Sequence, residues 1–391
     1  RNHLDELKML AKTANVDTLG IITQKLQKIN PAFYIGKGKA LQVINQAKLL
    51  SANVIIFDDE LSPAQIKNYH KLAKKIKVID RSSLILDIFK KHAKTREAKT
   101  QVELALSQYL LPRLTRQWTH LERQMGGVGT RAGMGETQIE VDRRLIRDKI
   151  SKLKLDLIKI ESERKTQSQN RAYEFRVALV GYTNAGKSTL FNSLTGNNVY
   201  VKDQLFATLD TTVRKLKLNK KHQVLISDTV GFIRKLPHNL VASFKSTLKE
   251  LLEANHILIV LDASSKIIDE HLETISQVLN ELGAKKIPKS YIFNKIDLVD
   301  NEIALKKLKF NYRNAILTSA LHHLRLDDVK NHLIEKIESD YNVFDLDISY
   351  KQGKILSQIQ NQAEILDTDY GDKAIKLKIR GKEDSIKRLF K

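Results

Sequence analysis

The sequence predicts an α/β fold divided among several domains, and three observations lead to this prediction. A glycine-rich loop stands between an apolar strand and a helix, short apolar strands alternate with helical segments before it, and long stretches show helical periodicity. A chain of 391 residues exceeds one ordinary domain, so separate cores are expected. We expect a small parallel α/β domain, a long antiparallel helical hairpin, a phosphate-loop (P-loop) domain and a small α+β domain, over residues 1–82, 83–171, 172–344 and 345–391.

The first domain is predicted from the alternation of strands and helices. Residues 18–22, 53–57 and 77–80 are apolar runs of strand length, and Ser62 followed by proline is a helix start. Such alternation favours a parallel sheet. The glycines and lysines of residues 36–39 allow two interpretations, a tight turn before a helix or a second anion site.

The hairpin is predicted from helical periodicity over residues 83–110 and again from about residue 136 to 170. The glycine-rich link at residues 122–131 is too polar for a core. We interpret it as a segment that inserts into RNA, with arginines on phosphates and glycines that allow close backbone approach; the alternative is a plain flexible tip. The predicted RNA contacts are Arg123, Gly126, Gly127, Gly129 and Arg131.

Residues 181–188 match the pattern GxxxxGK[ST] between a strand and a helix, which is typical of a phosphate-binding loop. Lys187 would reach the β- and γ-phosphates, and Ser188 would ligate Mg²⁺. The alternative is a chance glycine turn. The predicted nucleotide-binding residues here are Gly181, Tyr182, Thr183, Asn184, Ala185, Gly186, Lys187, Ser188 and Thr189.

Two switch segments are expected after this loop. The strand at residues 224–227 leads into Asp228, Thr229, Val230 and Gly231, where the carboxylate would hold Mg²⁺ through water and the Gly231 N–H would meet the γ-phosphate. Position 232, where many GTPases carry a water-orienting Gln, holds a phenylalanine that cannot form that hydrogen bond. We therefore expect slow intrinsic hydrolysis unless a partner, another side chain or a bound cation positions the water.

The first switch is expected over residues 204–212, a threonine-rich stretch. Thr208 is the favoured Mg²⁺ ligand, with Thr211 and Thr212 as competitors; the alternative is that these threonines only begin a strand. Lys187, Thr208 and Gly231 make up the predicted catalytic set. Asn184 either helps to hold a K⁺ ion near the phosphates, as in some GTPases of this broad group, or serves as a turn former.

A guanine-binding box follows the strand at residues 290–293. Asn294, Lys295 and Asp297 match its pattern, and the Asp297 carboxylate would accept from the ring N–H and the exocyclic amine of guanine. Adenine lacks that pair of donors, so the sequence favours GTP over ATP. Thr318, Ser319 and Ala320 would supply backbone donors to the guanine carbonyl, while Lys295 would pack along the ring.

The last segment predicts strands at residues 345–348 and 374–379, a helix over residues 353–364 and a last helix near Ser385. These elements indicate a small α+β module. No motif in it points to a function.

Composition limits the class of protein. The chain has no cysteine, which excludes disulfides and thiolate metal sites, and no apolar run approaches the length of a membrane span. We expect a cytoplasmic monomer without stable transmembrane association. The net charge is +22, and most of the positive surplus falls in residues 1–171. Such a surplus favours a polyanionic partner such as RNA or a ribosome, whereas a merely solvated basic surface is the alternative.

Four stretches resemble the HflX family of translation-associated GTPases: residues 34–39, 126–131 with 135–144, 198–210, and 228–237. The sequence departs from the family pattern at two places, and each change makes a turn less rigid. The family usually reads RGPGE where residues 131–136 have one more residue and no proline, and LDPT where Asp210 is followed by two threonines. The resemblance implies GTP and GDP binding, association with the large ribosomal subunit and its RNA, hydrolysis stimulated by the ribosome, and separation of stalled or idle ribosomes into subunits.

Two other functional classes remain open from the residues alone. One is a regulatory GTPase that acts on a protein or membrane partner. The other is an RNA-remodelling NTPase with a second nucleotide site at residues 36–39.

Overall fold

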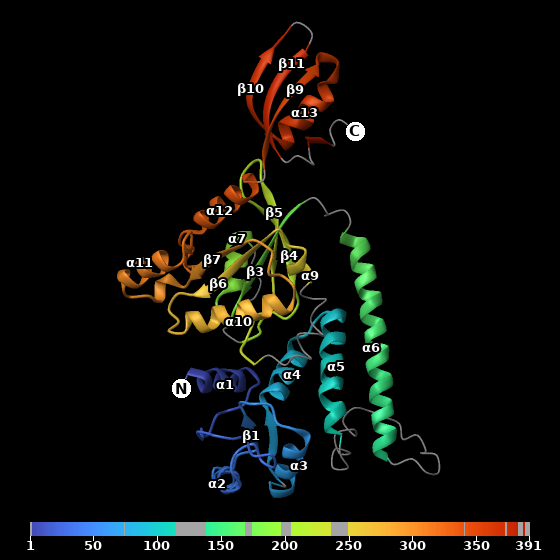
Figure 1. Cartoon of the computed structure of the whole chain (residues 1–391), viewed down its shortest axis with the longest axis vertical. Coiled ribbons are helices and arrows are strands. Elements are labelled where there is room, and N and C mark those ends of the chain that lie inside the picture. The colour runs from blue at the N-terminus through green and yellow to red at the C-terminus, as the bar shows by residue number, and fades with distance from the viewer. Residues whose placement is uncertain are drawn as a thin grey trace.

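The computed structural model confirms the multidomain α/β fold with a P-loop domain (Figure 1). It describes residues 2–73, 75–114, 138–168, 174–196, 205–235, 249–339, 341–371, 374–381 and 386–387. The boundaries assigned to the four domains remain predictions. No helix within these described ranges is long and apolar enough to cross a membrane.

The N-terminal region is a small α/β unit. Its elements are α1 (Asn2–Thr13), α2 (Lys37–Leu49), β1 (Val54–Phe57), α3 (Pro63–Leu72) and β2 (Lys77–Asp80), and the two strands are parallel. Ser62 and Gln65 form the reciprocal hydrogen bonds of a capping box at the start of α3, as the Ser-Pro pair suggested.

The strand predicted at residues 18–22 is wrong. This segment has no regular structure and pairs with no described strand, and the side chains of Leu19 and Ile21 are 56% and 52% exposed. An apolar pattern gives a strand only where another strand accepts its backbone groups, and Gly20 further weakens the tendency to extend.

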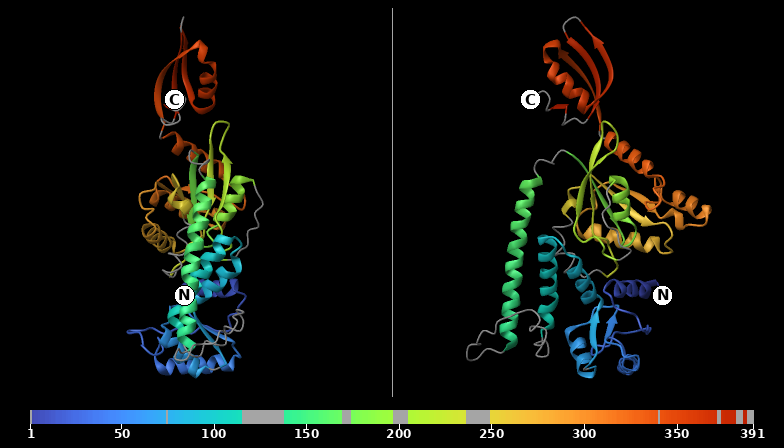
Figure 2. Two further views of the ribbon diagram at one scale, coloured as in Figure 1. Left: turned by 90° about the vertical axis from the view of Figure 1, so that its right-hand side faces the viewer. Right: turned by 180° about the vertical axis from the view of Figure 1, so that it is seen from behind.

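The helical part begins with α4 (Arg81–His92) and α5 (Arg96–Leu110), continues through a 3₁₀ turn (Leu111–Arg113), and returns as α6 (Gln138–Ser168). The periodicity predicted one helix where α4 and α5 stand, but Thr95 caps α5 by accepting from the Ala98 N–H and so divides the two. Helices α5 and α6 lie side by side (Figures 1 and 2), with an ion pair between Glu103 and Lys149.

A six-stranded sheet forms the P-loop domain, with the order β4-β5-β3-β6-β7-β8 and only β4 antiparallel to its neighbour. Alternate residues of β3 pack into two different core clusters, Ala178 and Val180 on one face of the sheet and Val177 and Leu179 on the other. The strands are β3 (Phe175–Gly181), β4 (Thr212–Lys217), β5 (Gln223–Asp228), β6 (His256–Asp262), β7 (Lys289–Asn294) and β8 (Ile316–Leu317).

The helices of this domain cover both faces of the sheet (Figures 1 and 2). They are α7 (Lys187–Thr195), α9 (Lys249–Leu252), α10 (Ile268–Glu281), α11 (Glu302–Asn311) and α12 (Leu326–Glu338), with a 3₁₀ turn at Ile296–Leu298. Because parallel strands end at the same edge of the sheet, the loops after β3, β5 and β7 meet there.

The C-terminal region is an antiparallel sheet with the order β10-β11-β9, covered by α13 (Gly353–Gln362) after a 3₁₀ turn at Tyr350–Gln352. The strands are β9 (Asn342–Ser349), β10 (Glu364–Tyr370) and β11 (Ala374–Gly381). Strand β10 was not predicted. Ser385, near the last predicted helix, lies outside the described residues.

Candidate nucleotide-binding site

The phosphate loop connects β3 to α7 and depends on two glycines. Gly186 has φ +86°, and a Cβ there would lie 2.2 Å from Nδ2 of Asn294. A Cβ on Gly181 would lie 2.2 Å from the Val260 carbonyl oxygen. No other residue fits either position without moving the backbone or its neighbours. The first N–H groups of α7 have no partner within the helix, so they can face an anion.

Lys187 lies inside this loop. Its side chain is buried, and Nζ donates to the carbonyl oxygens of Gly181 and Tyr182 at 3.2 and 3.0 Å. Burial lowers the Lys187 pKa to about 8, although the Asp228 carboxylate opposes this change. A bound polyphosphate would raise that pKa again by adding negative charge next to the ammonium group.

The three oxygen ligands predicted for Mg²⁺ meet at one place. Ser188 Oγ lies 2.7 Å from Thr208 Oγ1 and donates to Asp228 Oδ2 at 2.6 Å. The other carboxylate oxygen, Oδ1, is buried without a partner among the described residues, and burial raises the Asp228 pKa. Two hydroxyls and a carboxylate are the hard donors that Mg²⁺ prefers, so this set fits the ion.

Of the three candidate threonines in the first switch, Thr208 is the one that contacts Ser188. Thr212 begins β4, as the alternative interpretation of these threonines allowed, and Thr211 lies directly before that strand. Residues 206–208 line the same pocket as Thr183, Lys187, Ser188 and Gly231.

The second switch is attached to the phosphate loop by backbone hydrogen bonds. Thr183 N donates to the Phe232 carbonyl at 2.7 Å, and Phe232 N donates to the Gly181 carbonyl at 3.0 Å. A Cβ on Gly231 would lie 2.9 Å from Thr183 Cα, which explains the glycine at this point. Thr229 is fully buried, and its hydroxyl donates to the Leu179 carbonyl at 2.7 Å.

Asn294 joins the phosphate loop to the loop after β8, where backbone donors to guanine are predicted. Its Nδ2 donates to the Ala185 carbonyl at 3.0 Å, and its Oδ1 accepts from Ala320 N at 2.9 Å. Lys295 has φ +62° and forms an ion pair with Asp262 at 2.7 Å. The loop after β7 is therefore fixed against both the phosphate loop and the loop after β8.

Asp297 lies in the 3₁₀ turn after β7, with its carboxylate 3.7 Å from Nε2 of His322. The neighbouring Ile296 N–H donates to the Thr318 carbonyl, so Asp297 and the loop after β8 are adjacent. The Ser319 N–H donates to the Leu324 carbonyl at 3.2 Å, and Ala320 N already bonds Asn294. The Thr318 N–H donates to the Phe293 carbonyl at 2.9 Å, so all three backbone donors expected for the guanine carbonyl are paired within the protein.

The structure therefore gathers the predicted nucleotide-binding residues at one edge of the sheet. The residues predicted to contact RNA, Arg123, Gly126, Gly127, Gly129 and Arg131, lie outside the described residues.

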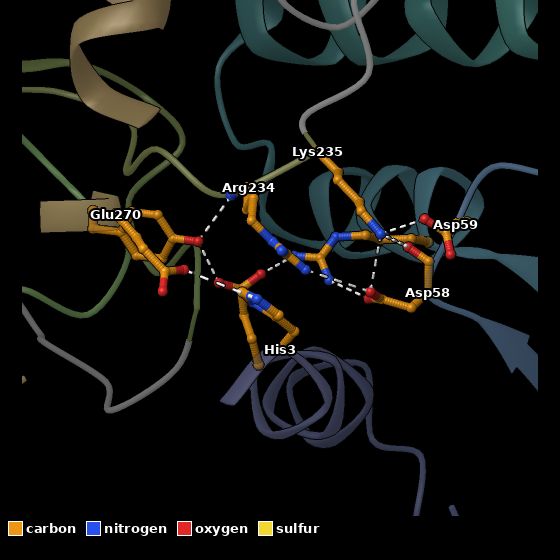
Figure 3. A network of polar contacts seen from close by, with 9 residues as sticks. His3, Asp58, Asp59, Arg234, Lys235 and Glu270 are labelled. Atoms are coloured by element: carbon orange, nitrogen blue, oxygen red, sulfur yellow. Dashed lines mark hydrogen bonds and ion pairs between the residues drawn. The ribbon is translucent and has the colours of Figure 1, made fainter. Parts of the chain in front are cut away.

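A polar network that the sequence did not reveal joins the phosphate loop to the N-terminal region (Figure 3). The Tyr182 hydroxyl donates to Glu6 and accepts from the Arg234 N–H at 2.9 Å, and its ring stacks on His271. Arg81 is 1% exposed and pairs with both Glu6 and Asp58, the latter at 2.7 Å.

The same network continues along the second switch. Lys235 pairs with Asp58 at 3.2 Å and with Asp59, and the Arg234 guanidinium lies 3.6 Å from Asp58. These carboxylates follow β1 directly. The only signal in the sequence was a run of three acidic residues in a strongly basic region.

The first switch also contacts the N-terminal region. Asp210 accepts from the Lys94 N–H at 3.1 Å and from the Thr95 hydroxyl. A ring nitrogen of His92 lies 2.8 Å from the Phe206 carbonyl oxygen, and the Phe206 ring meets Phe89 edge to face at 4.6 Å. Both switches are thus held against helices and loops of the first hundred residues.

Three family models together match most of residues 1–295: "GTP-binding GTPase N-terminal" over residues 1–90, "GTP-binding GTPase Middle Region" over 92–171 and "50S ribosome-binding GTPase" over 176–295. A GTP-binding protein from Sulfolobus solfataricus in complex with GDP is 26% identical, with 86% of this chain and 95% of that chain covered and a TM-score of 0.44. The GTPase HflX of Caldanaerobacter subterraneus is 42% identical over 96% of this chain and 86% of its own length. That of Escherichia coli is 40% identical over 99% and 92%. The chain therefore belongs to the HflX family of GTPases, and it hydrolyses GTP.

Proposed function

We propose that this GTPase binds the large ribosomal subunit in its GTP state and separates stalled or idle ribosomes into subunits. The observation that carries the proposal is the contact of both switches with the N-terminal region, where most of the positive surplus lies. GTP would order the switches and so set how the basic surface faces ribosomal RNA, and hydrolysis would release it. One of the matching families is described as a 50S ribosome-binding GTPase, which agrees with this proposal. The cytoplasm is the corresponding location.

In this proposal Ser188, Thr208 and Asp228 would hold Mg²⁺, which supplies charge neutralisation at the β- and γ-phosphates when bound. Lys187 and the N–H groups at the start of α7 would hold the phosphates, and the Gly231 N–H would bond the γ-phosphate. Asn184 has φ +62°, a conformation that suits a turn former. We also propose that it helps to hold a K⁺ ion near the phosphates.

The guanine base would lie between Asp297, Lys295 and the loop after β8. Asp297→Asn replaces an acceptor of two hydrogen bonds by an amide and should shift preference from guanine to xanthine nucleotides. Competition between GTP and XTP for a fluorescent guanine nucleotide measures this shift. Unchanged selectivity would remove Asp297 from the base site. Lys187→Ala is the control, because losing a phosphate contact should weaken the binding of GTP and XTP alike.

The ribosomal role is tested by GTP hydrolysis with and without large subunits in K⁺ buffer, together with co-sedimentation at several salt concentrations. We expect a slow basal rate, a strong stimulation by ribosomes, and binding that weakens steeply with salt. A variant lacking residues 126–135 should keep its basal rate and lose the stimulation. Full-length protein that is neither stimulated nor sedimented would point instead to a protein or membrane partner.

A further inference from the structure

The hydroxyl of Thr183 is buried and has no hydrogen-bond partner among the described residues. The residue is 7% exposed, and it lines the pocket that also holds Lys187, Ser188, Thr208 and Gly231. A buried hydroxyl normally finds a partner, because an unmet one loses the hydrogen bonds that water gave it. An unpaired hydroxyl in a ligand pocket therefore points to a bond with the ligand.

The position of Thr183 is that of the reacting end of the nucleotide. A Cβ placed on Gly231 would lie 2.9 Å from Thr183 Cγ2 and 3.0 Å from Lys187 Nζ. Thr183, the Gly231 backbone and the Lys187 ammonium group thus converge on one spot. In the nucleotide site proposed above, on which this inference rests, that spot receives the γ-phosphate.

Phe232 cannot orient the attacking water. Its side chain is 2% exposed and belongs to the core cluster that includes Val230, Ile233 and Ile259. Its backbone N–H and carbonyl are both bonded to the phosphate loop. Turning the ring into the pocket would remove it from the core, and a phenyl ring has no hydrogen-bonding group to offer.

Three other hydroxyls that line this pocket are already engaged. Those of Ser188 and Thr208 bond each other on the metal side, and that of Thr229 donates to the Leu179 carbonyl. Among the hydroxyls that line the pocket, Thr183 supplies the buried one without a partner in the described part of the chain.

We propose that the Thr183 hydroxyl orients the attacking water for GTP hydrolysis in place of the missing glutamine. The hydroxyl accepts a hydrogen bond from the water and undergoes no net proton transfer. The water oxygen bonds to the γ-phosphorus while the bond between that phosphorus and the β,γ-bridging oxygen breaks. GDP leaves, and the water proton ends on the inorganic phosphate or in solvent.

Thr183→Val and Thr183→Ser separate the hydroxyl from the shape of the side chain. Valine keeps the volume and the methyl contact with Gly231 but removes the hydroxyl, whereas serine keeps the hydroxyl. We expect valine to slow single-turnover GTP hydrolysis about 10- to 100-fold, with the affinity for a fluorescent GDP analogue changed less than about threefold, and serine to restore most of the rate. Thr195→Val, at the far end of α7, is the matched control and should leave both quantities unchanged.

Three outcomes would overturn the inference: a valine variant with the wild-type rate, equal losses in the valine and serine variants, or a valine variant that no longer binds GDP. The last would assign the hydroxyl to nucleotide binding instead of catalysis. Because co-sedimentation with large subunits is measured separately, failure here is distinguishable from failure of the ribosomal proposal.

Discussion

The GTPase domain joins the N-terminal and C-terminal regions in very different ways. On the N-terminal side one continuous core cluster includes Ile88 and Phe89 of α4 together with Phe206 and Phe232 of the two switches. The C-terminal sheet and α13 form a core cluster of their own, and a hydrogen bond from Arg380 to the Glu338 carbonyl spans 3.4 Å at that junction. Figures 1 and 2 show the C-terminal region standing beyond the end of α12.

This difference indicates which region would respond structurally to a change of the bound nucleotide. The predicted switches are the parts that would rearrange with the γ-phosphate, and they pack on the N-terminal region. The C-terminal sheet does not share their core. We therefore expect changes on the N-terminal side to alter GTP turnover and changes on the C-terminal side to leave it unaltered.

Arg81→Ala should have the largest effect. The change leaves Glu6 and Asp58 close together and without their buried cation, and removing one partner of a buried ion pair typically loses about 3–5 kcal/mol. Urea unfolding measures the loss. Lys330→Ala, which breaks an exposed pair with Asp327 on α12, should lose less than about 1 kcal/mol. Equal losses in the two variants would contradict the comparison.

Two core truncations test the same contrast through activity. Phe89→Ala removes a ring that touches Phe206 of the first switch, and Ile379→Ala empties a fully buried site in the C-terminal sheet. Each should lose about 2–5 kcal/mol of stability. We expect a changed GTP turnover at 20 °C for Phe89→Ala alone. A similar change for Ile379→Ala would show that the C-terminal region also reaches the switches.

A nucleotide site could be predicted from the sequence because its chemistry is local. The loop at 181–188 and the segments that follow β5 and β7 are each recognisable from a few consecutive residues. The polar network was beyond prediction, because Arg81 and Glu6 are 75 positions apart and Tyr182 and Glu6 are 176 apart. Strand β10 was missed for a related reason, since its acidic residues pair with lysines of β11 that only the folded sheet brings opposite.

Tyr182→Phe sharpens the comparison on the N-terminal side. It removes the hydroxyl that donates to Glu6 and accepts from the Arg234 N–H, while the ring can keep its stacking on His271. We expect a loss of about 1–3 kcal/mol and an altered GTP turnover, because the phosphate loop and the second switch lose one of the hydrogen bonds that join them. Tyr350→Phe, which removes a hydrogen bond to the Gly371 carbonyl in the C-terminal region, is the matched control and should leave turnover unchanged.

A histidine at the edge of the sheet opposite the nucleotide site should lower the stability of the folded protein in mild acid. His256 begins β6, lies 2.9 Å from the Ser290 hydroxyl, and is 2% exposed. Burial lowers its pKa to about 4, with smaller contributions in the same direction from His332 and Lys336. The folded pKa is below the unfolded value of about 6.5, so this histidine lowers stability as the pH falls from about 6.5 toward 4, by about 1.4 kcal/mol at pH 5.5.

Urea unfolding at pH 7.5 and 5.5, in the wild type and in His256→Gln, isolates this contribution as the part of the pH dependence that the variant lacks. Because His256 lies at the amino ends of the strands, away from both switches, GDP affinity should change with pH equally in the two proteins. A variant with the full wild-type pH dependence of stability would exclude His256 as its source.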